Sequence, residues 1–124
     1  MNHQRPVNLD LGSLTYPPMA IASILHRISG IVLFLLLPFM LYMLQLSLKS
    51  SASYDELQSL VARPYGKLIL WAFSSALIYH VIAGVRHMIL DLGIGEALHA
   101  ARRSAVAVIV LAVVAILSLG VWIW

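Results

Sequence analysis

Cysteine is absent from this chain of 124 residues, and charged residues are scarce. Without cysteine the chain can form no disulfide, and it can offer no thiolate to zinc or to an iron–sulfur cluster. Only 10% of the residues are charged and 61% are hydrophobic, which leaves too little polar surface for a soluble domain of this length. The sequence therefore predicts a single domain, residues 1–124, whose solvent is the lipid bilayer.

The small excess of positive charge does not indicate a nucleic-acid binder. The formal net charge is +3, but the basic residues are scattered and mostly adjoin apolar segments, whereas a nucleic-acid interface gathers them into a patch. Such positions are typical of charges at a membrane boundary. The polar N-terminal stretch lacks the apolar run and the small-residue cleavage site of a signal peptide, so we expect it to persist in the mature protein.

Three long apolar stretches predict an all-α membrane protein with transmembrane helices at about 19–48, 65–91 and 105–124. The first helix would be about 45 Å long at ~1.5 Å per residue, whereas the hydrocarbon core is ~30 Å thick. Its first two turns are therefore expected near one membrane face. Pro38 lies within this helix and predicts a kink.

The connections between the spans predict the orientation of the chain. Residues 49–64 show no hydrophobic period and are expected to form a loop, and residues 93–104 a turn region. With three spans, the N-terminus and the second connection share one side. Five arginines fall on that side and three basic residues on the other: Arg5, Arg27, Arg86, Arg102 and Arg103 against Lys49, Arg63 and Lys67. Because the more positive side is normally cytoplasmic, we expect a cytoplasmic N-terminus.

A histidine lies near the middle of the second span, where an ionisable side chain is costly and suggests a function. Ala76 and Gly84 stand one turn before and after His80 on the same helix face, and His87 and Asp91 continue the stripe. A flat macrocycle lying along a helix needs small neighbours beside its ligand, so the pattern favours His80 as a haem ligand. Two alternatives are a hydrogen bond between helices and a step in a proton relay.

No other histidine is expected to reach the same iron. His87 lies ~10 Å along the helix that carries His80, and cannot approach from the opposite side. His26 is on another helix, but we expect it at the depth of His87 and well above His80. His3 and His99 lie outside the predicted spans. A six-coordinate haem would therefore take its second ligand from another polypeptide, and otherwise the iron would be five-coordinate.

A second group of polar residues lies in the first span. Ser23, His26 and Arg27 are spaced by three and four residues, which places them on one helix face. Arg27 is a candidate to neutralise haem propionates or to bind a quinone carbonyl, and Ser23 to donate to the same carbonyl. Alternatively Arg27 reaches the lipid headgroups and Ser23 bonds to its own helix. Arg86 is expected to act only as a charge that sets topology.

Two of these segments resemble one known family. Residues 23–30 (SILHRISG) are similar to the first-helix signature of the cytochrome b membrane-anchor subunit of bacterial succinate dehydrogenase, enterobacterial type. Residues 79–91, with YHV, GVRHM and a final Asp91, resemble the second-helix signature of that family. Residues 5–11 (RPVNLDL) look like its opening, and residues 102–104 (RRS) precede the third span as they do there.

The resemblance implies functions that spacing alone does not give. In this family the chain pairs with a second small membrane-anchor subunit, and each supplies one histidine to a shared haem b. His80 matches the position of the axial ligand, and Ser23 and Arg27 match positions that line the ubiquinone site. Positions near the haem propionates correspond to His26, Arg27 and His87. An iron–sulfur subunit and a flavoprotein subunit, where succinate is oxidised, would complete the enzyme at the cytoplasmic face of the bacterial inner membrane.

Two other functions are alternatives to this interpretation. An anchor of a quinol:fumarate reductase would have the same architecture and run the reaction in reverse. A small helical membrane protein without a redox role, such as a transporter or assembly subunit, would carry no haem and would tolerate His80→Ala.

Overall fold

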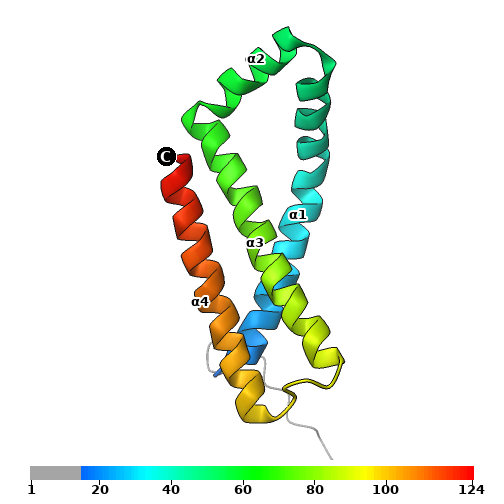
Figure 1. The fold of residues 1–124 in the computed structure, drawn as a ribbon, viewed down its shortest axis with the longest axis vertical. Coiled ribbons are helices and arrows are strands. Elements are labelled where there is room, and N and C mark those ends of the chain that lie inside the picture. The colour runs from blue at the N-terminus through cyan, green and yellow to red at the C-terminus, as the bar shows by residue number, and fades with distance from the viewer. Residues whose placement is uncertain (1–14) are drawn as a thin grey trace, which may run out of the picture.

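The computed structural model describes residues 15–124, which fold into four helices without a strand. The helices are α1 (Pro18–Lys49), α2 (Ser51–Val61), α3 (Pro64–Asp91) and α4 (Leu98–Ile123). The three longest, α1, α3 and α4, have the length and hydropathy to cross a membrane, which confirms the predicted all-α fold with three spans (Figure 1). His3 and the motif at residues 5–11 lie outside the described residues.

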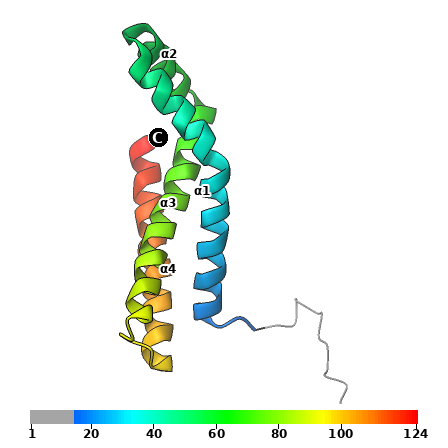
Figure 2. The ribbon, with the colours of Figure 1, turned by 90° about the vertical axis from the view of Figure 1, so that its right-hand side faces the viewer.

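Helix α3 is the central element of the bundle. It packs along α4 on one side and crosses α1 on the other (Figures 1 and 2). The first turns of α1, the last turns of α3 and the first turns of α4 lie together at one end, called here the histidine end. At the other end α1 and α3 diverge, and α2 bridges the gap between them, so we call it the open end.

Two prolines shape α1. Pro18 occupies the first helical turn, where a missing N–H costs nothing because that group has no partner in the helix. Pro38 lies inside the helix and removes one hydrogen bond from the ladder. Figure 2 shows that α1 changes direction in its second half, as the sequence predicts for a helix with an internal proline. The bend carries the C-terminal half of α1 toward α2.

The loop predicted between the first two spans is wrong, because residues 51–61 form α2. Its N-terminus is a capping box: the Ser50 side chain accepts from the Ser53 backbone N–H, and the Ser53 side chain accepts from the Ser50 backbone N–H. Ser53, Leu57, Leu60 and Val61 form a half-buried face at helical spacing. Polar residues lie between them, so the mean hydropathy of the segment does not reveal its helical spacing of apolar residues.

The predicted turn region before the third span is shorter than expected. Helix α4 begins at Leu98, seven residues before the predicted start of the span at residue 105 (105 − 98 = 7). Alanine and arginine both have a high helix propensity, so they extend the helix. Arginine is too polar for the hydrocarbon core, however, so hydropathy locates only the apolar part of this helix and not its first residue. The chain turns before α4 at Gly93 and Gly95, both with a φ of 79°, a conformation that glycine adopts without strain.

Small residues bring the helices together. The buried apolar residues of the described chain are Ala22, Tyr79, Ala83, Ala101, Ala105, Val108 and Ala112. Alanine at a contact lets helix backbones approach closely. Such close packing drives helix association in lipid, because the lipid tails are as apolar as the side chains and the hydrophobic effect does not favour contact between helices. Most of these residues lie in the half of the bundle that holds the histidines, so the closest packing surrounds the candidate site.

Candidate functional site

Three histidine side chains from two helices meet in the histidine end of the bundle. The rings of His26 on α1 and His80 on α3 are stacked, with centroids 4.2 Å apart and planes inclined by 14°. The ring of His87, two turns after His80, lies 5.1 Å from that of His26 at an angle of 49°. His26 therefore lies between the two histidines of α3, and all three rings are half-buried.

The predicted depth of His26 is therefore wrong, because its ring contacts that of His80. His26 lies eight residues from the start of α1, which is ~12 Å at 1.5 Å per residue. Counted from the end of α3 at Asp91, His87 lies ~6 Å and His80 ~16 Å along the axis. His26 is thus between them in height, and the crossing of α1 over α3 brings its ring against both.

The stacking also excludes His26 and His80 as the two axial ligands of one iron. The lone pair of an imidazole nitrogen lies in the plane of its ring. Two nearly parallel rings at 4.2 Å direct their lone pairs along parallel planes and cannot face one another across a metal. No group of three or more His, Asp or Glu residues within residues 15–124 could hold a metal ion. His26 and His80 therefore cannot bind one iron from opposite sides.

His80 is anchored to α1 through one of its two ring nitrogens. Its Nδ1 lies 3.1 Å from the hydroxyl oxygen of Ser29 and 3.3 Å from the carbonyl oxygen of His26. Both hydrogen-bond contacts of the ring thus involve Nδ1 and come from the α1 side. The other nitrogen, Nε2, forms no hydrogen bond with the described residues, and it is not enclosed as the corresponding atom of His26 is.

His26 has one nitrogen that is enclosed by the protein and still has no partner. Its Nε2 is the one buried side-chain polar atom in the described chain without a hydrogen bond. A Cβ added at Gly84 would lie 3.4 Å from this nitrogen, at van der Waals contact, so the ring lies directly against the backbone of α3. A buried imidazole nitrogen without a partner is costly, so the position of the His26 ring carries an energetic penalty within this bundle.

Ser23 and Arg27 lie one turn apart on α1, as their spacing predicts. Ser23 is half-buried and the Arg27 side chain is exposed on the surface of the chain. Between them in sequence, the helix turns His26 inward to the other histidines. The structure therefore separates the polar group of the first span: His26 belongs to the histidine cluster, whereas Ser23 and Arg27 remain accessible to a molecule or subunit outside the chain.

Arg86 has a role that the sequence reading missed. Instead of lying at the boundary as a topology charge, its side chain is only 7% exposed. The Arg86 Nε donates to the Ser104 hydroxyl and Nη2 donates to the Ala101 carbonyl, both at 2.9 Å. These bonds join α3 to α4, and they form because α4 begins early enough to place Ala101 and Ser104 beside α3. On the other side of α3, the Tyr79 hydroxyl donates to the Ala22 carbonyl of α1 at 3.0 Å.

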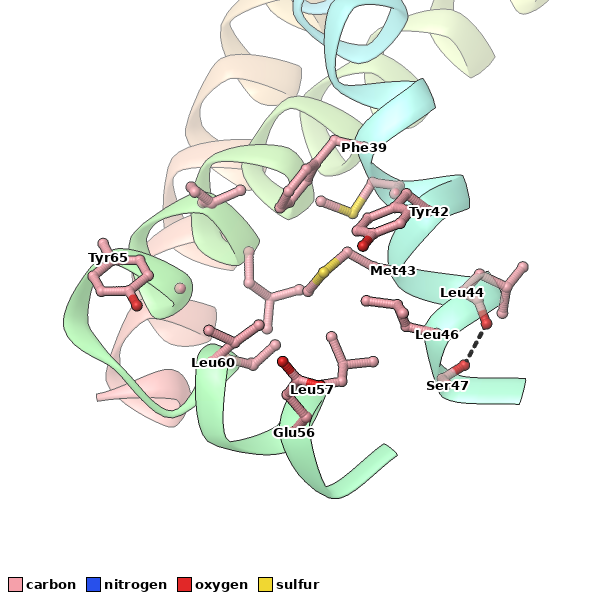
Figure 3. Close-up of a pocket in the computed structure, with 15 residues that line it drawn as sticks. Phe39, Tyr42, Met43, Leu44, Leu46, Ser47, Glu56, Leu57, Leu60 and Tyr65 are labelled. Carbon is pink, nitrogen blue, oxygen red and sulfur yellow. Dashed lines mark hydrogen bonds between the residues drawn. The ribbon is translucent and has the colours of Figure 1, made fainter. Parts of the chain in front are cut away.

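A cavity at the open end belongs to a different part of the molecule. It has a volume of about 580 Å³ and lies where α1 and α3 diverge beneath α2 (Figure 3). Aromatic and aliphatic side chains line it, among them Phe39, Tyr42, Met43, Leu57 and Leu60. None of the predicted site residues takes part. The cavity is a consequence of the divergence of the two helices and is separate from the histidine cluster.

Comparison with known proteins gives consistent matches along the chain. Residues 1–119 match the model of the family described as succinate dehydrogenase/fumarate reductase transmembrane subunit. A protein of Coxiella burnetii is 48% identical over 125 residues, covering 100% of both chains. One of Paracoccus denitrificans is 33% identical over 119 residues, covering 95% of this chain and 92% of its own. One of Rickettsia typhi is 33% identical over 102 residues, covering 82% and 77%.

All three relatives bear the name succinate dehydrogenase cytochrome b556 subunit. The names favour the succinate dehydrogenase interpretation over both alternatives, the quinol:fumarate reductase anchor and the membrane protein without a redox role.

Proposed function

The chain belongs to the succinate dehydrogenase/fumarate reductase transmembrane subunit family, and we propose that it is the membrane-anchoring haem b subunit of a succinate dehydrogenase. It holds the enzyme at the membrane with three helices and takes part in the transfer of electrons from succinate oxidation to a quinone. Succinate itself is oxidised on another subunit. The observation that carries the proposal is the histidine cluster, in which His80 is fixed through Nδ1 and keeps Nε2 free of partners in the described chain.

This chain would contribute one axial ligand to the haem, and that ligand would be His80. Histidines that bind metals usually donate their second ring N–H to a carbonyl or another acceptor, which fixes the ring and leaves the other nitrogen for the metal. The contacts of His80 Nδ1 with Ser29 and His26 meet this requirement. When bound, the haem supplies one-electron redox chemistry. The residues of this chain hold and orient it.

The second axial ligand comes from a partner subunit. The stacked arrangement of His26 and His80 excludes His26, and His87 is on the helix of His80 itself. A second small membrane-anchor subunit that donates one histidine would place the haem between the two chains. In that position we expect His26, Arg27 and His87 to lie near the haem propionates.

Ser23 and Arg27 form this chain's share of the site for ubiquinone. They lie one turn apart on α1 at the histidine end, with Arg27 exposed and Ser23 half-buried. Arg27 donates hydrogen bonds with a fixed positive charge, so it favours the negative charge that develops on the quinone oxygen as electrons arrive. Ser23 donates to the same carbonyl. A site with little water strengthens both interactions, because water no longer screens them.

The remaining subunits dock at the same end of the bundle. We place the iron–sulfur and flavoprotein subunits on the cytoplasmic side of a bacterial inner membrane, where the positively charged connections of this chain and its N-terminus also lie. This orientation puts Ser23, Arg27 and the histidine cluster on the side from which the electrons enter. The open end with α2 then faces away from the catalytic subunits.

A visible difference spectrum tests the proposal. The complex purified with this chain is reduced with dithionite, and its spectrum is compared with that of the oxidised complex for wild type, His80→Ala and His99→Ala. We expect a b-type α-band in wild type and in His99→Ala, whose histidine is exposed at the start of α4. The band should be lost or shifted in His80→Ala. A folded wild-type complex without this band would show that the chain is not a haem b subunit.

A further inference from the structure

The ring of His80 is held by a small part of α1 that consists of Ser29, Gly30 and the main chain of His26. Ser29 is buried, with 6% of its surface exposed, and its hydroxyl lies 3.1 Å from His80 Nδ1. The same hydroxyl donates to the carbonyl oxygen of His26 at 2.7 Å. That carbonyl lies 3.3 Å from Nδ1 as well. Three polar atoms thus form a closed triangle of contacts between α1 and α3.

This triangle determines which nitrogen of His80 carries the proton. A carbonyl oxygen can only accept, so the contact between His26 O and Nδ1 is a hydrogen bond only when Nδ1 carries the proton. The Ser29 hydroxyl already uses its proton to bond the same carbonyl, and it therefore presents a lone pair to Nδ1. A neutral imidazole with its proton on Nδ1 has an unprotonated Nε2, which is the form that binds a metal.

Gly30 leaves the space that this arrangement needs. A Cβ at position 30 would lie 3.2 Å from Cε1 of His80, closer than carbon atoms normally approach. The edge of the ring that contains Nδ1 and Cε1 thus lies directly against α1, with the hydroxyl of Ser29 on one side and the bare backbone of Gly30 below. The stacked ring of His26 restricts the remaining rotation.

We propose that Ser29 is a positioning residue for the haem: its hydroxyl accepts from Nδ1 of His80, fixes the tautomer and the plane of that ring, and raises its basicity as an iron ligand. The inference rests on the proposed function, because it concerns how His80 serves a haem. A more basic ligand stabilises ferric over ferrous iron. Ser29 therefore holds the reduction potential of the haem below the value it would have without this hydrogen bond.

The test compares Ser29→Ala, Ser29→Thr and the matched control Ser75→Ala in the purified complex. Ser75 is a half-buried serine on the spanning helix α3, where its hydroxyl donates to the Trp71 carbonyl and forms no hydrogen bond with His80. The readouts are the midpoint potential of the haem by spectroelectrochemical titration, its low-spin electron paramagnetic resonance signal, and the haem content per complex. None of these requires turnover.

We expect Ser29→Ala to raise the potential, alter the resonance signal and weaken haem retention by about 10-fold, the lower limit for loss of a hydrogen bond to a metal-binding histidine. Ser29→Thr restores the acceptor and should return all three readouts toward wild type, and Ser75→Ala should leave them unchanged. A Ser29→Ala complex that fails to assemble with haem supports the inference if Ser29→Thr assembles normally.

Three results would overturn the inference. One is a Ser29→Ala complex with full haem, the wild-type potential and the wild-type resonance signal. Another is an equal change in Ser29→Ala and Ser29→Thr, which would assign the effect to the shape of residue 29 and not to its hydroxyl. The last is an equal change in Ser75→Ala. Failure of the proposed function looks different, because wild type itself would then lack the b-type band.

Discussion

The two ends of the bundle are built in different ways. At the histidine end the helices are joined by directional contacts: Tyr79 to the Ala22 carbonyl, Arg86 to Ser104 and Ala101, and His80 to Ser29. At the open end α1 and α3 diverge, and bulky apolar side chains line a cavity of about 580 Å³. Hydrogen bonds join α3 to α4 there, from Trp71 Nε1 to the Ile116 carbonyl, and α2 to α1, from the Ser53 hydroxyl to the Leu46 carbonyl. The contacts between α1 and α3 are what distinguish the two ends.

The difference between the ends corresponds to what each end has to do. A ligand must be held within a fraction of an ångström of its productive position, and this requires support from packed neighbours and hydrogen bonds. The bridging helix α2 has only to connect two spans and cover their ends. We therefore expect substitutions at the histidine end to change redox properties, and comparable substitutions at the open end to change only local order.

The largest expected effect is on quinone reduction, which should fall after a substitution at the histidine end and not after one at the open end. Arg27→Ala removes a charged donor from the proposed quinone site and should lower quinone reduction by about 100-fold, as loss of a donor to a developing negative charge does. Lys67→Ala removes a cation at the open end, where Nζ lies 5.6 Å from the Trp124 ring centroid, and should have little effect. Succinate-dependent reduction of ubiquinone is measured against reduction of a soluble electron acceptor by the same complex. Equal activities in the two variants would contradict the assignment of the quinone site to the histidine end.

The second effect concerns the polar connection between α3 and α4. Arg86→Met keeps much of the side-chain length but leaves the Ala101 carbonyl and the Ser104 hydroxyl without their buried donor. Loss of these bonds should cost about 2 kcal/mol of stability. The measurement is thermal inactivation of the detergent-solubilised complex. Arg103→Met, which removes an exposed charge from the same end, serves as the control, and equal destabilisation by the two variants would show that burial of Arg86 is unimportant.

A pair of glycine substitutions gives the third effect and separates the two ends directly. Gly30→Ala places a methyl group against Cε1 of His80 and should weaken haem binding by about 10-fold while α2 stays in place. Gly66→Ala collides with the Leu60 carbonyl and the Val61 backbone, so it should displace α2 while haem is retained. Haem content and limited proteolysis near residues 51–61 are compared in both variants. Loss of haem in Gly66→Ala with α2 intact would reverse the expected pattern.

The smallest effect is confined to α2. Ser50→Ala removes the side-chain half of the capping box, and loss of such a cap costs about 1 kcal/mol. We expect faster hydrogen exchange in the first turn of α2 and an unchanged haem spectrum. Ser59→Ala alters a serine on the same helix that only bonds its own turn, and should leave exchange at the cap unaffected. A change in the haem spectrum of Ser50→Ala would show that the two ends are coupled.

The sequence predicted those features that depend on local pattern. Hydropathy located the three spans because lipid imposes about 20 apolar residues on each crossing. His80 was identified because a histidine at that depth is costly and the residues on its face are small. These inferences needed no knowledge of how the helices pack.

Features that depend on the packing of two helices could not be predicted in the same way. The height of His26 relative to His80 depends on where α1 crosses α3, and counting residues from the ends of the helices assumed that they run parallel. The role of Arg86 depends on the early start of α4, which polar residues conceal from a hydropathy scale. The contact of Ser29 with His80 likewise depends on the crossing of α1 and α3 and has no signal in the local sequence.

The predominance of alanine among the buried residues has a consequence for biogenesis. None of the larger side chains within residues 15–124 is completely buried, so the isolated chain has little internal packing with which to protect itself after insertion. A newly synthesised copy would be recognised by membrane proteases until its partner subunit covers it. Degradation of unassembled copies would then keep the anchor subunits at equal numbers without any control of their synthesis.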